Sequence, residues 1–179
     1  ERTLETVTRC AMDAATAVAH IQANAGKYGG DPKRILSTGS SAGGFISAWI
    51  AYQKGWEWPE TAKYKPEKLN VVGWFGDSPF LPTELISQIG PGDPPAFFMY
   101  GGDKEHAGTP NSQGYEIREA FQREKIWNKM VQVDNWGHVP ARHFLFSPKT
   151  RDPNIFMAYD EFLKMIFHGH DESESGEII

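Results

Sequence analysis

The stretch that decides the fold is "RILSTGSSAGGFISAW", residues 34–49. Between an apolar run and an amphipathic run it places six small residues: Gly39, Ser40, Ser41, Ala42, Gly43 and Gly44. This order predicts a strand over 34–39, a tight turn, and a helix over 42–55. The small residues contain G-x-S-x-G, the pattern that exposes a nucleophilic serine at a sharp strand-to-helix turn. Ser41 is therefore the candidate nucleophile, and Ser40 takes the variable position.

The chemistry of such a turn explains why its residues are small. We expect Gly39 and Gly43 to flank Ser41 because a Cβ there would clash with the turn or with the packed helix. The N–H of Ala42, at the start of the helix, would face the oxyanion of a tetrahedral intermediate. Two alternatives are a glycine-rich phosphate loop, which lacks its G-K-[ST] or G-x-G-x-x-G pattern here, and an ordinary turn that contains serine.

Strands and helices alternate along the rest of the chain, which predicts a mostly parallel sheet with helices on both faces. We expect one domain over 1–170 and a disordered acidic tail over 171–179. The predicted strands are 34–39, 70–79 with its turn, 94–103 and 126–134. The predicted helices are 3–26, 42–55, 82–90, 111–125 and 153–169.

Composition excludes several classes of protein. Of the 179 residues, 40% are hydrophobic, which argues against a disordered chain. The formal net charge of −5 makes nucleic acid an unexpected partner. A single cysteine, Cys10, permits no disulfide within the chain. No apolar run approaches the length of a membrane span, and the sequence leaves a cytoplasmic or a secreted location open.

A nucleophilic serine needs a base, and the chain has six histidines. His138, in "DNWGHVP", follows the last predicted strand and is our first choice; His143 is the second, and His106 follows an earlier strand. The remaining three, for which we expect structural roles, are His20, His168 and His170. A metal site made of the last two with Asp171 and Glu172 is the weaker alternative.

The orienting acid should follow another strand. Asp103, in "FFMYGGDKEH", follows the third predicted strand and is our choice. Glu105 is close enough to replace it, and Asp77 also lies at a strand end. Each of these carboxylates has the alternative of being a solvated loop residue.

The block "DAATAVAHIQANAGKYGGDPKRILSTGSSAGG", residues 13–44, resembles the carboxylesterase and lipase branch of the α/β-hydrolases. It is most similar to hormone-sensitive-lipase-like esterases and to acetyl-xylan and feruloyl-type carbohydrate esterases. The resemblance implies an α/β-hydrolase fold, a triad of Ser41, Asp103 and His138, and no metal or organic cofactor. The family's acid usually lies one residue further past the glycine turn than Asp103, which keeps Glu105 open.

One departure from this family concerns the oxyanion hole. Its members carry His-Gly-Gly upstream of the serine, and no such stretch occurs in this sequence. We therefore expect the chain to be the C-terminal half of the catalytic domain, with a companion N-terminal segment or chain that completes the oxyanion hole. The alternative is a complete chain that has lost activity.

The expected substrate is an ester with a short acyl chain or a carbohydrate part. Trp136, two residues before His138, is a candidate pocket residue, and Trp56 and Trp58 could stack on sugar or phenolic rings. We expect Trp49 and Trp74 to pack in the core. The competing functions are a serine peptidase of the same fold and a non-catalytic interaction module.

Overall fold

The computed structural model describes residues 4–102 and 109–168. Its centre is a four-stranded sheet in the order β1-β2-β3-β4, and every neighbouring pair is parallel. The strands are β1 (Ile35–Ser40), β2 (Val71–Asp77), β3 (Ala96–Gly101) and β4 (Asn128–Val133). The predicted parallel sheet and all four predicted strands are confirmed.

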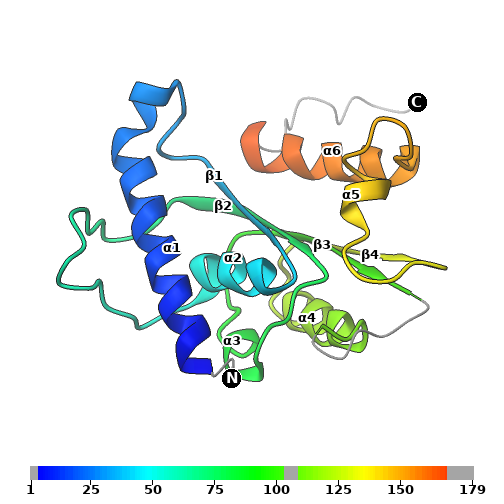
Figure 1. The fold of residues 1–179 in the computed structure, drawn as a ribbon, viewed down its shortest axis with the longest axis horizontal. Helices are drawn as coiled ribbons and strands as arrows, with labels where there is room; N and C mark the ends of the chain where they lie inside the picture. The colour runs from blue at the N-terminus through cyan, green and yellow to red at the C-terminus, as the bar shows by residue number, and fades with distance from the viewer. Residues whose placement is uncertain (1–3, 103–108, 169–179) are drawn as a thin grey trace, which may run out of the picture.

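Helices cover both faces of this sheet (Figure 1). Each strand is added on the same side of the previous one, and right-handed crossovers then place the connecting helices on one face. That face carries α2 and α4, with α1 packed against α2, and α6 covers the other face. The helices are α1 (Leu4–Asn24), the 3-10 helix η1 (Ala25–Tyr28), α2 (Ala42–Tyr52), α3 (Thr83–Ile86), α4 (Ser112–Arg123), α5 (Ala141–Phe144) and α6 (Pro153–His168).

Two hydrophobic clusters hold the layers together. Side chains alternate across the sheet, so Trp74 and Phe98 face α2 and α4, whereas Phe75 and Phe97 face α6. All four are at most 2% exposed. Burial on both faces explains why β2 and β3 are continuous apolar runs rather than alternating patterns.

The structure differs from the sequence prediction mainly at helix ends. The predicted helix 82–90 is only the four-residue α3, and α5 was not predicted. Between α2 and β2, residues 53–70 contain no helix or strand. No helix in 4–102 or 109–168 is long and apolar enough to cross a membrane. The tail 171–179 lies outside the described residues.

Candidate active site

Ser41 occupies the turn between β1 and α2, which confirms the predicted strand–turn–helix context. Its backbone has φ 54° and ψ −121°, a conformation that costs a non-glycine residue on the order of 1–3 kcal/mol. The Ser41 N–H donates to the carbonyl of Asp77, at the end of β2, over 2.8 Å. The turn thus stores backbone strain, and the neighbouring strand holds it in place.

Close packing around the turn explains two of its glycines. A Cβ on Gly39 would lie 2.1 Å from the carbonyl oxygen of Gly43, and a Cβ on Gly44 would lie 2.7 Å from the Cβ of Pro79. The prediction for Gly43 itself was wrong, because a Cβ there would meet nothing within 4 Å. The two positions of the turn that require glycine are therefore Gly39, which faces the backbone of α2, and Gly44, which faces Pro79 just after β2.

Ala42 is the first residue of α2 and is exposed. Its N–H is one of the donors that a helix leaves unpaired at its start, and none of the described residues accepts a hydrogen bond from it. A donor in this position can bind an oxygen that carries negative charge next to Ser41.

His138 lies on the segment between β4 and α5, and this segment crosses the end of β3. A Cβ on Gly101 would lie 2.0 Å from the carbonyl oxygen of Gly137 and 2.4 Å from that of Trp136. Only a glycine permits this approach. The crossing brings His138 to the carboxyl edge of the sheet, where Ser41 also lies.

Backbone strain concentrates at this edge. In the described part of the chain, five non-glycine residues have a positive φ. All except Lys125 lie on the segments that follow β1, β2 and β4, which meet at this edge. One of them is Val139, whose branched Cβ makes φ 53° unusual. Its N–H donates to the Ser78 hydroxyl over 3.0 Å, which ties the histidine segment to β2. The four are Ser41, Ser78, Asn135 and Val139.

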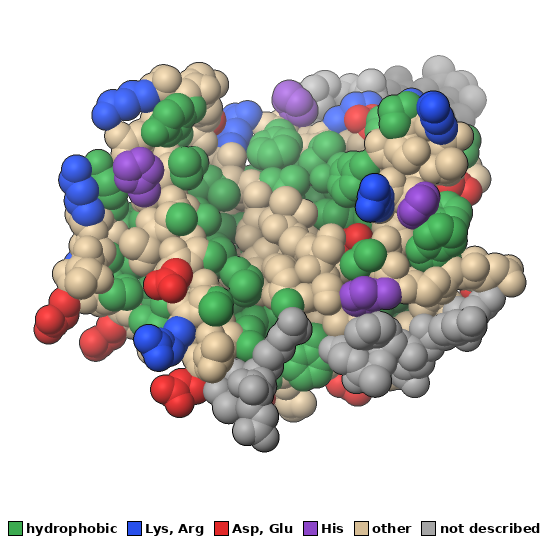
Figure 2. Space-filling model, in the orientation of Figure 1, with side chains coloured by type: hydrophobic (Ala, Val, Ile, Leu, Met, Phe, Trp, Pro, Cys, Tyr) green, Lys and Arg blue, Asp and Glu red, His purple; other side chains and the backbone are tan. Residues whose placement is uncertain are grey.

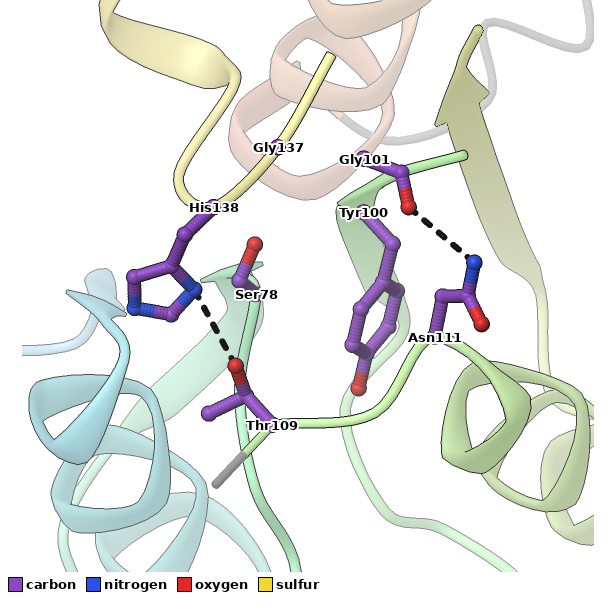
Figure 3. A pocket seen from close by; sticks show the side chains of 7 residues that line it. All are labelled: Ser78, Tyr100, Gly101, Thr109, Asn111, Gly137 and His138. Atoms are coloured by element: carbon purple, nitrogen blue, oxygen red, sulfur yellow. Dashed lines mark hydrogen bonds between the residues drawn. The ribbon is translucent and has the colours of Figure 1, made fainter. Parts of the chain in front are cut away.

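The His138 ring is held through Nδ1, which shares a 3.0 Å hydrogen bond with the Thr109 hydroxyl (Figure 3). Ser78, Tyr100 and Gly101 line the same small hollow. Asn111, from the start of α4, donates to the Gly101 carbonyl over 3.2 Å and steadies the end of β3. In the tautomer whose Nδ1 carries the proton, Nε2 has the lone pair that a base for the serine needs.

The predicted triad is only partly within the described residues. Asp103, Glu105 and His106 lie in 103–108, outside the described ranges. Ser41 and His138 lie at one strand edge, but their side chains share no hydrogen bond in the described part of the chain.

Asp77 ends β2 at this edge, and its side chain is buried at 2% exposure. It accepts hydrogen bonds from the Ser40 hydroxyl and from the Ala141 N–H, each over 3.2 Å. Burial raises the pKa of Asp77 to about 6, and the two hydrogen bonds oppose that rise. The sequence analysis considered Asp77 as a triad acid or as a solvated loop residue. Its contacts with the Ser41 turn and with the unpredicted helix α5 join residues far apart in the chain, so no local pattern predicts them.

The aromatic candidates lie in packed positions. The Trp136 ring contacts the rings of His143 and Phe144 at centroid distances of 4.6 and 5.0 Å. Trp56 and Trp58 contact each other at 4.4 Å and follow α2, whose other end carries Ser41. The Trp56 ring also packs against the ring of Trp49 on α2, at a centroid distance of 4.9 Å.

Two further histidines of the described residues lie on helices α1 and α6. His20 on α1 packs edge-on against Tyr64. His168 ends α6, and His170 lies outside the described residues. Within 4–102 and 109–168, no group of three histidine, cysteine or acidic residues is arranged to hold a metal ion.

Comparison with known proteins decides the family. Residues 3–107, more than half of the chain, match the model of the BD-FAE family. This match includes the turn with Ser41. The chain belongs to the BD-FAE family. A search of curated proteins finds no match.

Solved structures agree with this BD-FAE assignment at the level of the fold. Esterase 2 of Thermogutta terrifontis with bound butyrate has a TM-score of 0.70 and 19% identity, over 88% of this chain and 66% of that one. Its propionate-bound form gives 0.71 and 21%, over 88% and 65%. The form phosphonylated by sarin gives 0.70 and 20%, over 90% and 67%. The chain thus has the α/β-hydrolase fold of these esterases and spans about two thirds of their length.

Proposed function

We propose that this BD-FAE protein is a serine carboxylic-ester hydrolase that works through an acyl-enzyme. The observation that carries the proposal is the strained Ser41 between β1 and α2, beside an unpaired Ala42 N–H. A serine held this way projects its hydroxyl from the edge of the sheet, and the adjacent N–H stabilises negative charge. His138 at the same edge supplies the base.

The reaction transfers an acyl group to water in two steps. His138 Nε2 takes the Ser41 proton while Oγ bonds to the ester carbonyl carbon, whose oxygen becomes an oxyanion beside the Ala42 N–H. The carbonyl re-forms, the alcohol leaves, and His138 returns the proton to it. Water then attacks the acyl-serine in the same way and releases the acid and free Ser41.

We propose Asp103 as the acid that orients His138. Support comes from the 3.0 Å contact of Nδ1 with Thr109, because Thr109 follows the segment 103–108 in the chain. Glu105 remains the alternative within that segment. Short acyl groups fit the relatives that bind butyrate and propionate, and an ester of a carbohydrate remains the proposed alcohol part.

We also propose that a companion segment completes the sheet and the oxyanion hole. β1 ends the sheet, and its residues Ile35–Ser40 carry no charged side chain. β4, at the other end, exposes Lys129. A charged residue protects an edge from pairing with another strand, so β4 is protected and β1 is open to a further strand. The centre of the face in Figure 2 is largely hydrophobic or uncharged, and charged side chains gather around it.

The test is labelling of the intact protein with a fluorophosphonate probe, followed by peptide mass spectrometry. We expect label on Ser41 and an activity loss of at least about 10³-fold in Ser41→Ala. Ser87→Ala is the matched control and should keep the label, because it removes an exposed serine hydroxyl at the end of α3 that makes no contact with the described residues of the candidate site. Absence of label from Ser41 would reject the proposal in favour of a non-catalytic module.

Specificity is tested in the same preparation. An ester and an anilide with the same butyryl group separate an esterase from a peptidase, because the acyl pocket is held constant. We expect hydrolysis of the ester to exceed that of the anilide by orders of magnitude. Equal rates would favour the peptidase.

A further inference from the structure

Asp77 is the buried acid that the proposed mechanism leaves unused. It ends β2 between two neighbours, paired with Ser40 on β1 and with Met99 on β3. At 2% exposure, an acid of this kind is retained only where its oxygens have partners.

Those partners come from the two segments that carry the reacting groups. Oδ2 accepts from the hydroxyl of Ser40, the residue directly before Ser41. Oδ1 accepts from the N–H of Ala141, three residues after His138. The Asp77 main chain adds a third link, because its carbonyl accepts from the Ser41 N–H.

We propose that Asp77 is a positioning residue whose carboxyl group joins the nucleophile turn to the histidine segment and so fixes Ser41 relative to His138. The proposal rests on the proposed function for its effect on rate, and on the two hydrogen bonds for its structural part. Asp77 acts through Ser40 and Ala141 and touches no substrate.

The contacts distinguish this role from that of a triad acid. A triad acid accepts a hydrogen bond from Nδ1 of the histidine. Here the two oxygens of Asp77 accept from the Ser40 hydroxyl and the Ala141 N–H, and in the described part of the chain neither accepts from a ring nitrogen of His138. A positioning acid needs its shape and hydrogen bonds, whereas a triad acid also needs its charge.

Asparagine separates the two roles. In Asp77→Asn, Oδ1 can still accept from Ala141, and the amide NH₂ can donate to the Ser40 hydroxyl. In Asp77→Ala both links are lost. A misplacement of about 1 Å between reacting groups lowers the rate about 10²-fold.

The first experiment measures kcat and KM of the intact protein on p-nitrophenyl butyrate. We expect Asp77→Ala to lose about 10²-fold in kcat with KM little changed, and Asp77→Asn to stay within about fivefold of the parent. Asp93→Ala is the matched control, because Asp93 also joins a backbone N–H, that of Gly90, to a side chain, that of Lys54. It lies just before β3, away from the site, and should leave kcat unchanged.

The second experiment measures amide hydrogen exchange and needs no catalysis. Asp77→Ala should speed exchange at Ala141 at least about tenfold, whereas Asp77→Asn and Asp93→Ala should leave it near the parent rate. A parent protein that is inactive and takes no label would reject the proposed function. The exchange rate at Ala141 would then be the test of whether the Asp77 carboxyl group joins the two segments.

Two results would overturn the inference. A loss in Asp77→Asn as large as in Asp77→Ala would make Asp77 a triad acid. An unchanged exchange rate at Ala141 in Asp77→Ala would show that the carboxyl group does not hold the histidine segment to the nucleophile turn.

Discussion

At the scale of single residues, the charged form of the buried Asp77 carboxyl group lowers the stability of the folded state. The carboxyl group holds its proton up to about pH 6, whereas the same group in the unfolded chain loses it near the ordinary value of 3.8. Between these values the folded state binds more protons than the unfolded state, so this group makes stability fall as pH rises. Above pH 6 both states are ionised and the loss is complete.

This behaviour predicts the pH dependence of a variant. The free energy of unfolding of Asp77→Asn should equal that of the parent near pH 4 and exceed it by on the order of 3 kcal/mol at pH 7, because asparagine has no charge to bury. Urea unfolding of both proteins at pH 4, 5, 6 and 7 measures the difference, in which the other carboxylates cancel. Parallel curves across this range would contradict the assignment.

At the scale of elements, the start of α2 lies against the residues that follow β2. Gly44 makes this approach possible, because a Cβ would lie 2.7 Å from Pro79, whereas Gly43 one residue earlier faces open space. Gly44→Ala should therefore lower the free energy of unfolding by about 1–3 kcal/mol through overpacking. Gly43→Ala is the matched control and should be neutral or slightly stabilising, since alanine favours helix. Chemical denaturation measures both, and equal losses would mean that the helix does not approach β2 this closely.

The sequence predicts elements well where a local pattern defines them. The strand–turn–helix around Ser41 could be predicted because its strand, small residues and helix are contiguous in the sequence. The central strands could be predicted because burial on two faces makes them apolar runs. The prediction that a Cβ on Gly43 would clash was wrong, because the sequence does not show in which direction a Cβ at that position would point. The contacts of Asp77 with Ser40 and Ala141 join residues far apart in the chain, and α5 is too short to have a periodicity.

At the scale of the whole molecule, the two edge strands of the sheet differ in charge. The charged Lys129 on β4 discourages pairing with another chain, and β1 has no such residue. Thr38, in the middle of β1, is exposed. An unprotected edge pairs with whatever strand is available, which in the proposed protein is the companion segment.

The 179-residue chain on its own should therefore associate through β1. We expect sedimentation velocity to detect dimers or larger species that grow with concentration, and Thr38→Lys to reduce the association constant at least about tenfold, because pairing would bury the new charge. Gln132→Lys places the same charge on the edge that Lys129 already protects, so this control should leave association unchanged. A chain that stays monomeric at every concentration, or that responds equally to both substitutions, would show that β1 is not the pairing edge. Addition of the companion segment should compete with self-association for the same reason, since one strand edge accepts one partner strand.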